Sequence, residues 1–378
     1  MTTSSLSFER PVEGRQLVAR VDVVLVLATI VLAAVGVVMV YSATRDHQAA
    51  LGLSSRYYLY RQAMFVGLGV VAMAVLAAVD YHWIEHAGTI LYVGIVVALV
   101  AMFGIGHTAL GATRWINLGP FQFQPSAFAV LVEIAVVAAF CARRSEGLER
   151  RDIFKILVAQ ALPIALVVKQ PDLGSGIVLG VVLFVMLVMA GVPNRYLLLL
   201  IALVVAAAFG MVHFGLLKHY QVQRLTSFLH QSSGAQSTTY NLHQSVAAIG
   251  SGGMFGTGLF KGLQTNLAFV PEQQTDFIFS AVGEQLGFVG SAAVLAIEGL
   301  ICWRVLRAAA VARDTLGRLL AIGAFTLIAF SVFENAGMTM GIMPIAGIPL
   351  PFLSYGGSAT LSFFAAVGLA LSVQLRRR

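Results

Sequence analysis

The sequence predicts an all-α integral membrane protein with about ten transmembrane helices and a large extracytoplasmic loop between the seventh and the eighth. Of 378 residues, 58% are hydrophobic and 11% are charged, whereas soluble domains carry roughly a quarter charged residues. Apolar runs recur along the chain, each about 20 residues long and able to cross a hydrocarbon core of about 30 Å. Basic residues gather in alternate connections between these runs, as the positive-inside rule requires.

The apolar runs divide the chain in order from its N-terminus. Residues 1–21 are polar and predict a cytoplasmic tail, and residues 22–378 predict a single membrane domain. The first run is longer than a signal-peptide core, so we expect an uncleaved span. The predicted spans are 22–41, 62–79, 88–105, 126–142, 153–168, 174–191, 196–217, 277–303, 318–341 and 358–374.

Charge assigns the two sides of the membrane. A cytoplasmic N-terminus places the basic clusters at 143–155, 304–318 and 376–378 on the cytoplasmic side, together with the C-terminus. The outer side then receives the connections around 111–125, 169–175 and 343–357 and the long loop 218–275. Because orientation explains the net charge of +7, we expect membrane lipids as partners and no nucleic acid.

A carboxylate at the outer mouth of the eighth predicted span is the strongest candidate for chemistry. Glu272 and Asp276 precede the apolar run there. Thr275 or Asp276 in this place is typical of a helix N-cap, which needs no further function. Asp276 facing a cavity is equally consistent with a catalytic carboxylate, so both interpretations are open.

Other outer residues are candidates for binding, each with a simpler alternative. Asp172 lies in a Pro-Asp-Leu-Gly turn and caps the next helix or contacts a ligand. Ser354 lies between prolines and a glycine pair, which exclude a continuous helix and leave a cavity wall or a turn. Singly, outer cations are typical headgroup anchors, but together they suit a diphosphate; these are Arg61, Arg114, Lys169 and Lys261.

The sequence lacks clear metal-ligand and nucleotide motifs. It contains two cysteines and no Cys/His cluster of metal-ligand spacing. Residues 250–255 lack the final glycine of a dinucleotide fingerprint, so direct use of ATP is not expected. Acidic residues within or near the predicted spans must be neutral, paired or turned to a cavity; these are Glu133, Glu298 and Glu334.

Several segments together resemble the SEDS (shape, elongation, division, sporulation) family. The resemblance extends in consistent order from about Tyr41 to the end of the chain. The matching segments are residues 114–119, 171–174, 244–253, 262–264, 269–279, 284–288 and 348–358. Gln244 and Ser245 begin the third of them. Residues 269–272 and 262–264 resemble the RodA branch more than the FtsW branch.

The resemblance implies a peptidoglycan glycosyltransferase of the bacterial cytoplasmic membrane, which polymerises lipid II on the outer face for cell elongation and shape. The family's essential aspartate falls on Asp276, which would take the proton from the acceptor 4-hydroxyl during an inverting displacement. Arg61 and Arg114, with a divalent cation such as Mg²⁺ or Mn²⁺ left open, would stabilise the leaving diphosphate. The expected partner is a class B penicillin-binding protein, which supplies transpeptidation.

One departure from the family pattern concerns the fourth predicted span. The family has Gln-Pro-Ser-Glu followed three residues later by Lys, whereas this chain has Ala127 and Val130 at the charged positions. Losing both removes an oppositely charged pair without stranding either partner, and Glu133 is the candidate substitute. The alternatives to a polymerase are a lipid II flippase and a non-catalytic scaffold for a transpeptidase.

Overall fold

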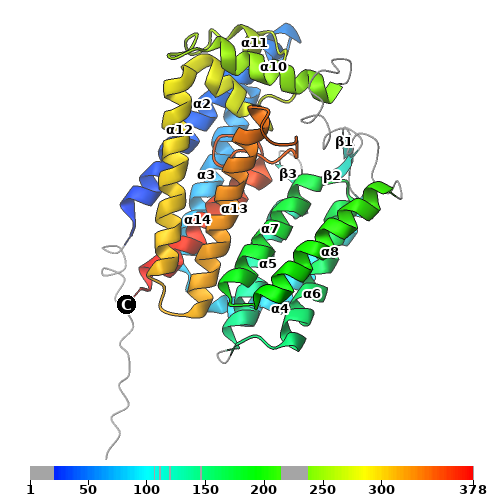
Figure 1. The fold of residues 1–378 in the computed structure, drawn as a ribbon. Coiled ribbons are helices and arrows are strands. Elements are labelled where there is room, and N and C mark those ends of the chain that lie inside the picture. The colour runs from blue at the N-terminus through cyan, green and yellow to red at the C-terminus, as the bar shows by residue number, and fades with distance from the viewer. Residues whose placement is uncertain are drawn as a thin grey trace, which may run out of the picture.

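The computed structural model describes residues 21–105, 107–109, 112–118, 121–144, 147–213 and 237–377. Long helices run side by side, and a small sheet and short helices cover one end of them (Figure 1). Within this described part, eight helices are long and apolar enough to cross a membrane. The predicted all-α membrane fold is therefore confirmed.

Each predicted span coincides with a helix of the structure. They are α2 (Val23–Ala50), α3 (Tyr57–Ala78), α4 (Trp83–Ile105), α5 (Pro125–Ala142), α6 (Arg150–Lys169), α7 (Leu173–Met189), α8 (Asn194–His213), α12 (Ile278–Ala310), α13 (Thr315–Thr339) and α14 (Gly357–Leu375). Two of them stand outside the eight: α7 has 17 residues, and α6 carries charges at both ends. The predicted tail falls outside the described residues up to residue 20.

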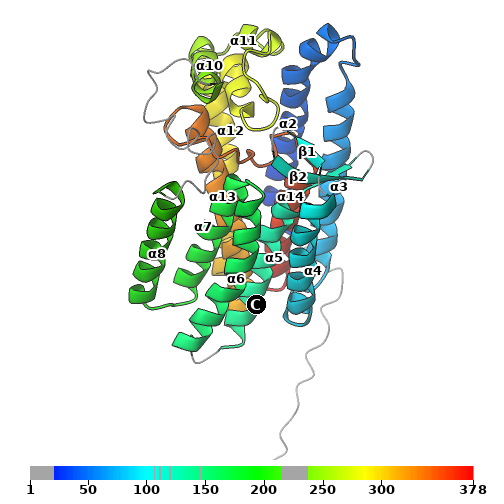
Figure 2. The same cartoon turned by 90° about the vertical axis from the view of Figure 1, so that its right-hand side faces the viewer.

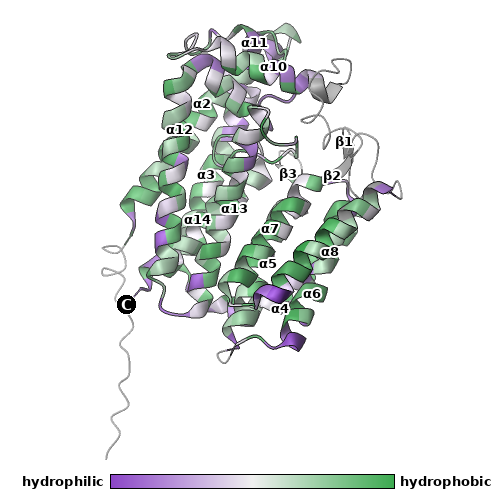
Figure 3. Cartoon of the chain, in the orientation of Figure 1, coloured by the Kyte–Doolittle hydropathy of each residue, from purple (hydrophilic) through white to green (hydrophobic). Residues whose placement is uncertain are grey.

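Helix α14 is the centre of the bundle. It packs against α3, α5, α12 and α13. In its most apolar 18-residue stretch 89% of the residues are buried, compared with 6% in the corresponding stretch of α8. Helix α8 lies at the edge of the bundle (Figure 2). Figure 3 shows apolar residues along the helices and hydrophilic residues mainly at their ends, the pattern expected of helices surrounded by lipid.

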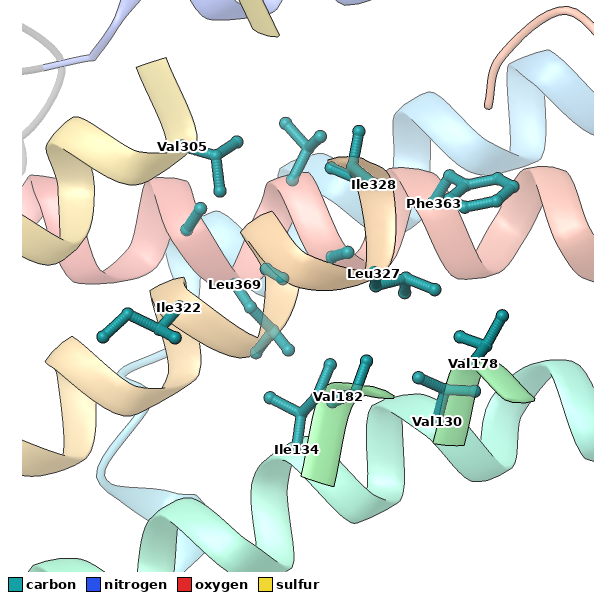
Figure 4. Packing of buried hydrophobic residues seen from close by; sticks show 14 of the residues in the cluster. Val130, Ile134, Val178, Val182, Val305, Ile322, Leu327, Ile328, Phe363 and Leu369 are labelled. Atoms are coloured by element: carbon teal, nitrogen blue, oxygen red, sulfur yellow. The ribbon is translucent and has the colours of Figure 1, made fainter. Parts of the chain in front are cut away.

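An apolar seam joins two parts of the bundle below the sheet. Its side chains come from α5 and α7 on one side and from α13 and α14 on the other (Figure 4). Figure 4 labels Val130, Ile134, Val178 and Val182 on one side and Ile322, Leu327, Phe363 and Leu369 on the other, together with Ile328 of α13 and Val305 of α12. This contact is apolar and non-directional, since it is made of branched and aromatic side chains without polar atoms.

The connection between α4 and α5 differs from the prediction. It forms a three-stranded antiparallel sheet of β1 (His107–Ala109), β2 (Ala112–Leu118) and β3 (Phe121–Phe123), where we predicted only a short outer connection. Residues 113–118 favour a strand, since they include Thr113, Trp115 and Ile116. The Gly-Pro pair after them is a turn signal, so the hairpin was detectable in the sequence.

In its described part, the long loop between α8 and α12 carries two helices, α10 (Ser237–Ser251) and α11 (Leu263–Asn266). They lie over the ends of α2 and α12 (Figure 1). Of the predicted loop 218–275, residues 218–236 lie outside the described residues. The described half packs on the bundle, since α10 contacts α12 and α13 and α11 contacts α2.

Helix α12 is interrupted at Gly287, whose φ of 67° and ψ of −165° are not helical. The loop supplies the hydrogen bonds missing at this kink. The carbonyls of Glu284 and Gln285 accept from the amides of Thr257 at 2.9 Å and Gly258 at 3.1 Å. In return, the amides of Phe288 and Val289 donate to the loop carbonyls of residues 253 and 254. The four main-chain groups that the kink takes out of the helical ladder are therefore all hydrogen-bonded.

Charged contacts tie the turns at the opposite end of the bundle. Arg304 Nε donates to Asp22 Oδ2 at 2.7 Å, and Asp22 also caps α2. In the turn between α3 and α4, His82 lies between two carboxylates, with Nδ1 2.7 Å from Asp80 and Nε2 2.9 Å from Asp314. Asp314 is the N-cap of α13, so this contact links two helix connections.

Candidate active site

A cavity of about 700 Å³ lies at the end of the bundle that carries the sheet. Its walls come from α3, β2, β3, α5, α7, α10, α13 and α14 and from segments 271–277, 345–349 and 355–357. Val130, Val178, Leu327 and Phe363 line it as well as the apolar seam of Figure 4. The cavity is therefore polar near segments 271–277 and 355–357 and apolar where it meets the seam.

Asp276 lines this cavity and is partly exposed. Helix α12 begins at Ile278 with Phe277 in the N-cap position, so neither Thr275 nor Asp276 occupies that position. The main chain around Asp276 is held from two sides. Asn335 Nδ2 donates to the Asp276 carbonyl at 2.8 Å, and the Tyr355 amide donates to the Gln274 carbonyl at 2.8 Å.

Glu272 also lines the cavity but is exposed. Its φ of 52° lies in the left-handed region that is uncommon for residues other than glycine. Gln274 Nε2 donates to its carboxylate at 3.2 Å, and the Thr275 hydroxyl donates to its carbonyl at 3.0 Å. Glu272 thus sits at a tight turn whose far end presents Asp276 to the cavity.

Asp172 is buried in the cavity wall at the centre of a polar network. Its Oδ2 accepts from the hydroxyls of Ser126 and Ser175, both at 2.8 Å, and from Gln124 Nε2 at 3.1 Å. Its Oδ1 accepts from the Ser175 amide at 3.3 Å and caps α7. The capping interpretation is therefore confirmed, and the same side chain also lines the cavity.

Arg61 lies on the α3 side of the cavity among aromatic rings. Its guanidinium is 4.8 Å from the Tyr57 ring centroid, and the rings of Tyr58 and Tyr355 meet edge to face at 4.9 Å. Burial raises the pKa of the Tyr355 phenol, an effect that Arg61 partly offsets. The sequence prediction missed both tyrosines, although Tyr58 lies one helical turn before Arg61.

Four helices present their N-terminal ends to the cavity. Lining residues lie in the first turns of α5, α7 and α14, and Phe277 is the N-cap of α12. Helix N-termini carry partial positive charge and free amides, which favour anions. Among the described lining residues the formal charges are Arg61 against Asp172, Glu272 and Asp276.

The structure places the other predicted binding residues away from the cavity lining. Ser245 is fully buried and donates to the Thr339 carbonyl at 2.8 Å, while Gln244 is partly exposed on α10. Ser354 is buried, and its hydroxyl accepts from the Leu350 amide at 2.8 Å. Ser245 therefore ties α10 to the end of α13, and Ser354 stabilises the turn that begins at Leu350.

The predicted cations are dispersed. Lys169 is exposed at the end of α6, with its amine 5.5 Å from the Phe103 ring centroid. Lys261 is exposed in the loop between α10 and α11. Arg114 lies in β2, but its side chain is outside the described residues. Of the four outer cations, Arg61 is the described one that lines the cavity.

A family model for cell cycle proteins, comprising FtsW, RodA and SpoVE, matches residues 22–378. The chain belongs to this family. The chain is 35% identical to the probable peptidoglycan glycosyltransferase FtsW of Geobacter sp. (strain M18), covering 94% of this chain and 97% of that protein. It is 37% identical to the peptidoglycan glycosyltransferase MrdB of Escherichia coli (strain K12), covering 83% and 84%.

A solved structure agrees with this FtsW/RodA/SpoVE membership. It is a chain from a peptidoglycan synthase complex that coordinates polymerization and crosslinking, and it matches with a TM-score of 0.77 and 28% identity. The match covers 94% of this chain and 97% of the solved chain. The fold and nearly the whole length are therefore shared with a known FtsW/RodA/SpoVE-like structure.

The departure of this FtsW/RodA/SpoVE member at Ala127 and Val130 falls in the cavity wall. Both residues line the cavity on the first turns of α5. Glu133, the suggested substitute, is buried and does not line the cavity, and neither of its carboxylate oxygens has a hydrogen-bond partner among the described residues. Within the described residues, Glu133 therefore does not restore a charge to this wall.

Proposed function

We propose that this chain is a peptidoglycan glycosyltransferase that joins lipid II units into glycan strands at the described cavity. Its curated relatives bear the name peptidoglycan glycosyltransferase, which confirms the activity class predicted from the sequence. Lipid II as both donor and acceptor, and the residues that act on it, are the parts we propose. The observation that carries them is Asp276, which shares one cavity with Arg61 and four helix N-termini.

In this proposal Asp276 acts as the general base. Its carboxylate takes the proton from the acceptor 4-hydroxyl while that oxygen attacks the anomeric carbon of the donor. Attack from the face opposite the diphosphate inverts the anomeric configuration, so an α-linked diphosphate yields a β-linked glycan. Glu272 is exposed at the neighbouring turn, which suits contact with the incoming chain more than proton transfer.

The leaving diphosphate needs positive charge on the opposite side of the reacting carbon. Arg61 can donate to phosphate oxygens in a fork, and the N-terminal ends of α5, α7 and α14 add amides and dipoles. Among the described residues no group of three or more His, Cys, Asp or Glu side chains could hold a metal ion. We therefore derive no step through a divalent cation, and its requirement stays a prediction.

The sidedness and partner complete the proposal. Basic residues at the end opposite the cavity support cytoplasmic termini and a cavity open to the outer face. The related synthase complex couples polymerization to crosslinking, which supports a class B penicillin-binding protein as the transpeptidase partner. FtsW and MrdB match at similar identity, so the RodA branch and a role in elongation remain predictions.

Reconstitution with labelled lipid II separates this function from its alternatives. Proteoliposomes of the chain with its transpeptidase should convert lipid II into long strands that resolve on a gel and that a muramidase digests. Translocation of lipid II between leaflets without polymer would instead identify a flippase. Normal binding of the transpeptidase without polymer or translocation would identify a scaffold.

A further inference from the structure

Asn335 on α13 joins two segments that are far apart in sequence. Its side chain is fully buried, and Nδ2 donates to the carbonyl of Asp276 at 2.8 Å and to the carbonyl of Ile348 at 2.8 Å. Two carbonyl acceptors need two N–H donors, so the amide nitrogen must face them. Both hydrogens of the amide are therefore used between the segments.

The two segments form adjoining walls of the cavity. Asp276 and Phe277 belong to one, and Gly347, Ile348 and Pro349 belong to the other. Both segments are irregular, since one lies between α11 and α12 and the other between α13 and α14, where it carries Pro349 and Pro351. Irregular backbone has no regular hydrogen-bond ladder of its own, so a buried side chain that bonds both carbonyls determines their separation.

Neighbouring contacts also hold these two segments, but they do not replace the hydrogen bonds that Asn335 donates to Asp276 and Ile348. The adjacent Glu334 accepts from the Ala346 amide at 3.2 Å through Oε1, and the Tyr355 amide bonds the Gln274 carbonyl. When Asn335 is altered, Glu334 still holds the segment of Ile348 to α13, and the Tyr355 amide still holds the segment of Asp276 to the chain before α14. Neither contact touches the main chain of Asp276. We therefore expect Asn335 variants to fold.

We propose that Asn335 is a positioning residue that fixes the Asp276 carboxylate at the distance and angle glycosyl transfer requires. The inference rests on the proposed function, because Asp276 is the base in that reaction. A carboxylate is carried by its own main chain, and a displacement of about 1 Å of a catalytic group can cost about 100-fold in rate. Asn335 touches no reacting atom and acts through Asp276.

A matched control exists on the same helix. Thr326 is buried on α13 like Asn335, but its hydroxyl donates to the Ile322 carbonyl of its own helix at 2.9 Å. Replacing it removes a buried polar group without loosening the two segments. Thr326→Ala thus measures the general effect of altering a buried polar residue of α13.

The experiment compares Asn335→Ala, Asn335→Asp and Thr326→Ala with wild-type protein in complex with the transpeptidase. The aspartate variant keeps the side-chain size and removes the donor, so it serves if the alanine variant folds poorly. The amount of monodisperse complex recovered by gel filtration normalises each preparation to folded protein, and lipid II binding and melting temperature are measured separately. We expect kcat to fall about 10- to 100-fold in both Asn335 variants, with KM within about threefold of wild type, and little change in Thr326→Ala.

A kcat within about twofold of wild type for either folded Asn335 variant would overturn the proposal. So would loss of lipid II binding in proportion to loss of thermal stability, since that pattern indicates a purely structural role. Hydrogen exchange adds an arm that needs no activity: residues 271–280 should exchange faster in Asn335→Ala, and residues 288–310 should not. If wild-type protein makes no glycan, the proposed function fails, and unchanged exchange in 271–280 separately refutes the joint.

Discussion

Ala127 and Val130 are apolar residues of the cavity wall at the two positions where the family pattern described above has a charged pair. Both lie on α5 beside the Asp172 network, which is fully supplied with donors from Ser126, Ser175 and Gln124. A charged pair at these positions would face the same space. Because both charges are missing together, neither position leaves a charge without its partner.

This pairing predicts a non-additive effect on stability. Val130→Lys alone places an unpaired ammonium in a site where the valine is 3% exposed, and it should destabilise the protein by about 1–3 kcal/mol. Adding Ala127→Glu three residues earlier supplies a partner on the same helix face. The double variant should therefore melt at a higher temperature than Val130→Lys alone. Equal melting temperatures would contradict the pairing.

Individual residues were predictable where a local pattern determines their place. Asp172 was predicted as a cap from its turn, and it is one. Asp276 was predicted at the outer end of a helix. Whether it is the N-cap depends on the residue at which α12 begins, and hydrophobicity does not specify that residue. Lys169 and Lys261 were predicted on the same side of the membrane as Asp276, but neither lines the cavity. The order of the spans predicts a side and does not specify where each side chain points.

At the scale of elements, the kinked α12 and the loop stabilise each other. Gly256 has a φ of +81°, and a Cβ there would lie 2.1 Å from the Gln285 carbonyl oxygen. A Cβ at Gly287, at the kink, would meet the Gly256 amide nitrogen at 2.3 Å. The main chains are thus in direct contact, which is why the loop can replace the hydrogen bonds that the helix lacks.

Gly256→Ala tests this contact. The left-handed conformation alone should cost roughly 1–3 kcal/mol, and the clash with fixed backbone adds to it. Gly299→Ala is the control, because Gly299 lies in the regular part of α12 and a methyl group added there would have nothing within 4 Å. We expect a clear drop in melting temperature for Gly256→Ala and none for Gly299→Ala. Equal behaviour would contradict the backbone contact.

The turn between α3 and α4 predicts a pH-dependent contribution to stability. Burial alone lowers the pKa of His82, but hydrogen bonds and charge from Asp80 and Asp314 outweigh it and raise the pKa above 6.5. Tyr81 and Arg376 also face the cluster, since Tyr81 donates to Asp314 and Arg376 lies 3.5 Å from Asp80. A raised histidine pKa stabilises the fold at low pH, and this contribution disappears as pH rises through the folded-state pKa.

His82→Gln should therefore reduce the melting temperature most below about pH 6.5, and the difference from wild type should shrink at higher pH. Because His82 is nearly half exposed, we expect less than about 1 kcal/mol. Melting curves of both proteins between roughly pH 5.5 and roughly pH 8.5 span the histidine pKa and measure the difference. A difference that grows with pH would contradict the linkage.

The sequence predicted the membrane spans correctly but did not predict the short strands and helices of the connections, for a physical reason. A span must bury about 20 apolar residues in lipid, so its signal is long and strong. The strands β1 and β3 have three residues each, and α11 has four. Such short elements depend on tertiary contacts more than on local propensity, and the contacts of α11 with α2 and of β3 with α14 are examples.

At the scale of the whole molecule, several helices direct their N-terminal ends toward the cavity. Four helix N-termini meet there, and the apolar seam continues from it between α5, α7, α13 and α14 (Figure 4). A cavity that gathers helix N-termini and Arg61 suits the charged diphosphate of the proposed substrate. The sequence predicted the common outer side of these segments, but not that the cavity would also be lined by Tyr58, Trp115 and Ser331.

The most direct test of Asp276 as the base is the rate of lipid II polymerisation by Asp276→Asn, which keeps the size of the side chain but cannot accept the proton. Asp46→Asn is the control, because Asp46 pairs with Arg45 on α2 and does not line the cavity. We predict that wild-type protein and Asp46→Asn make long strands, and that Asp276→Asn binds lipid II but polymerises it at least about 100-fold more slowly. Polymerisation by Asp276→Asn at the wild-type rate would contradict this role.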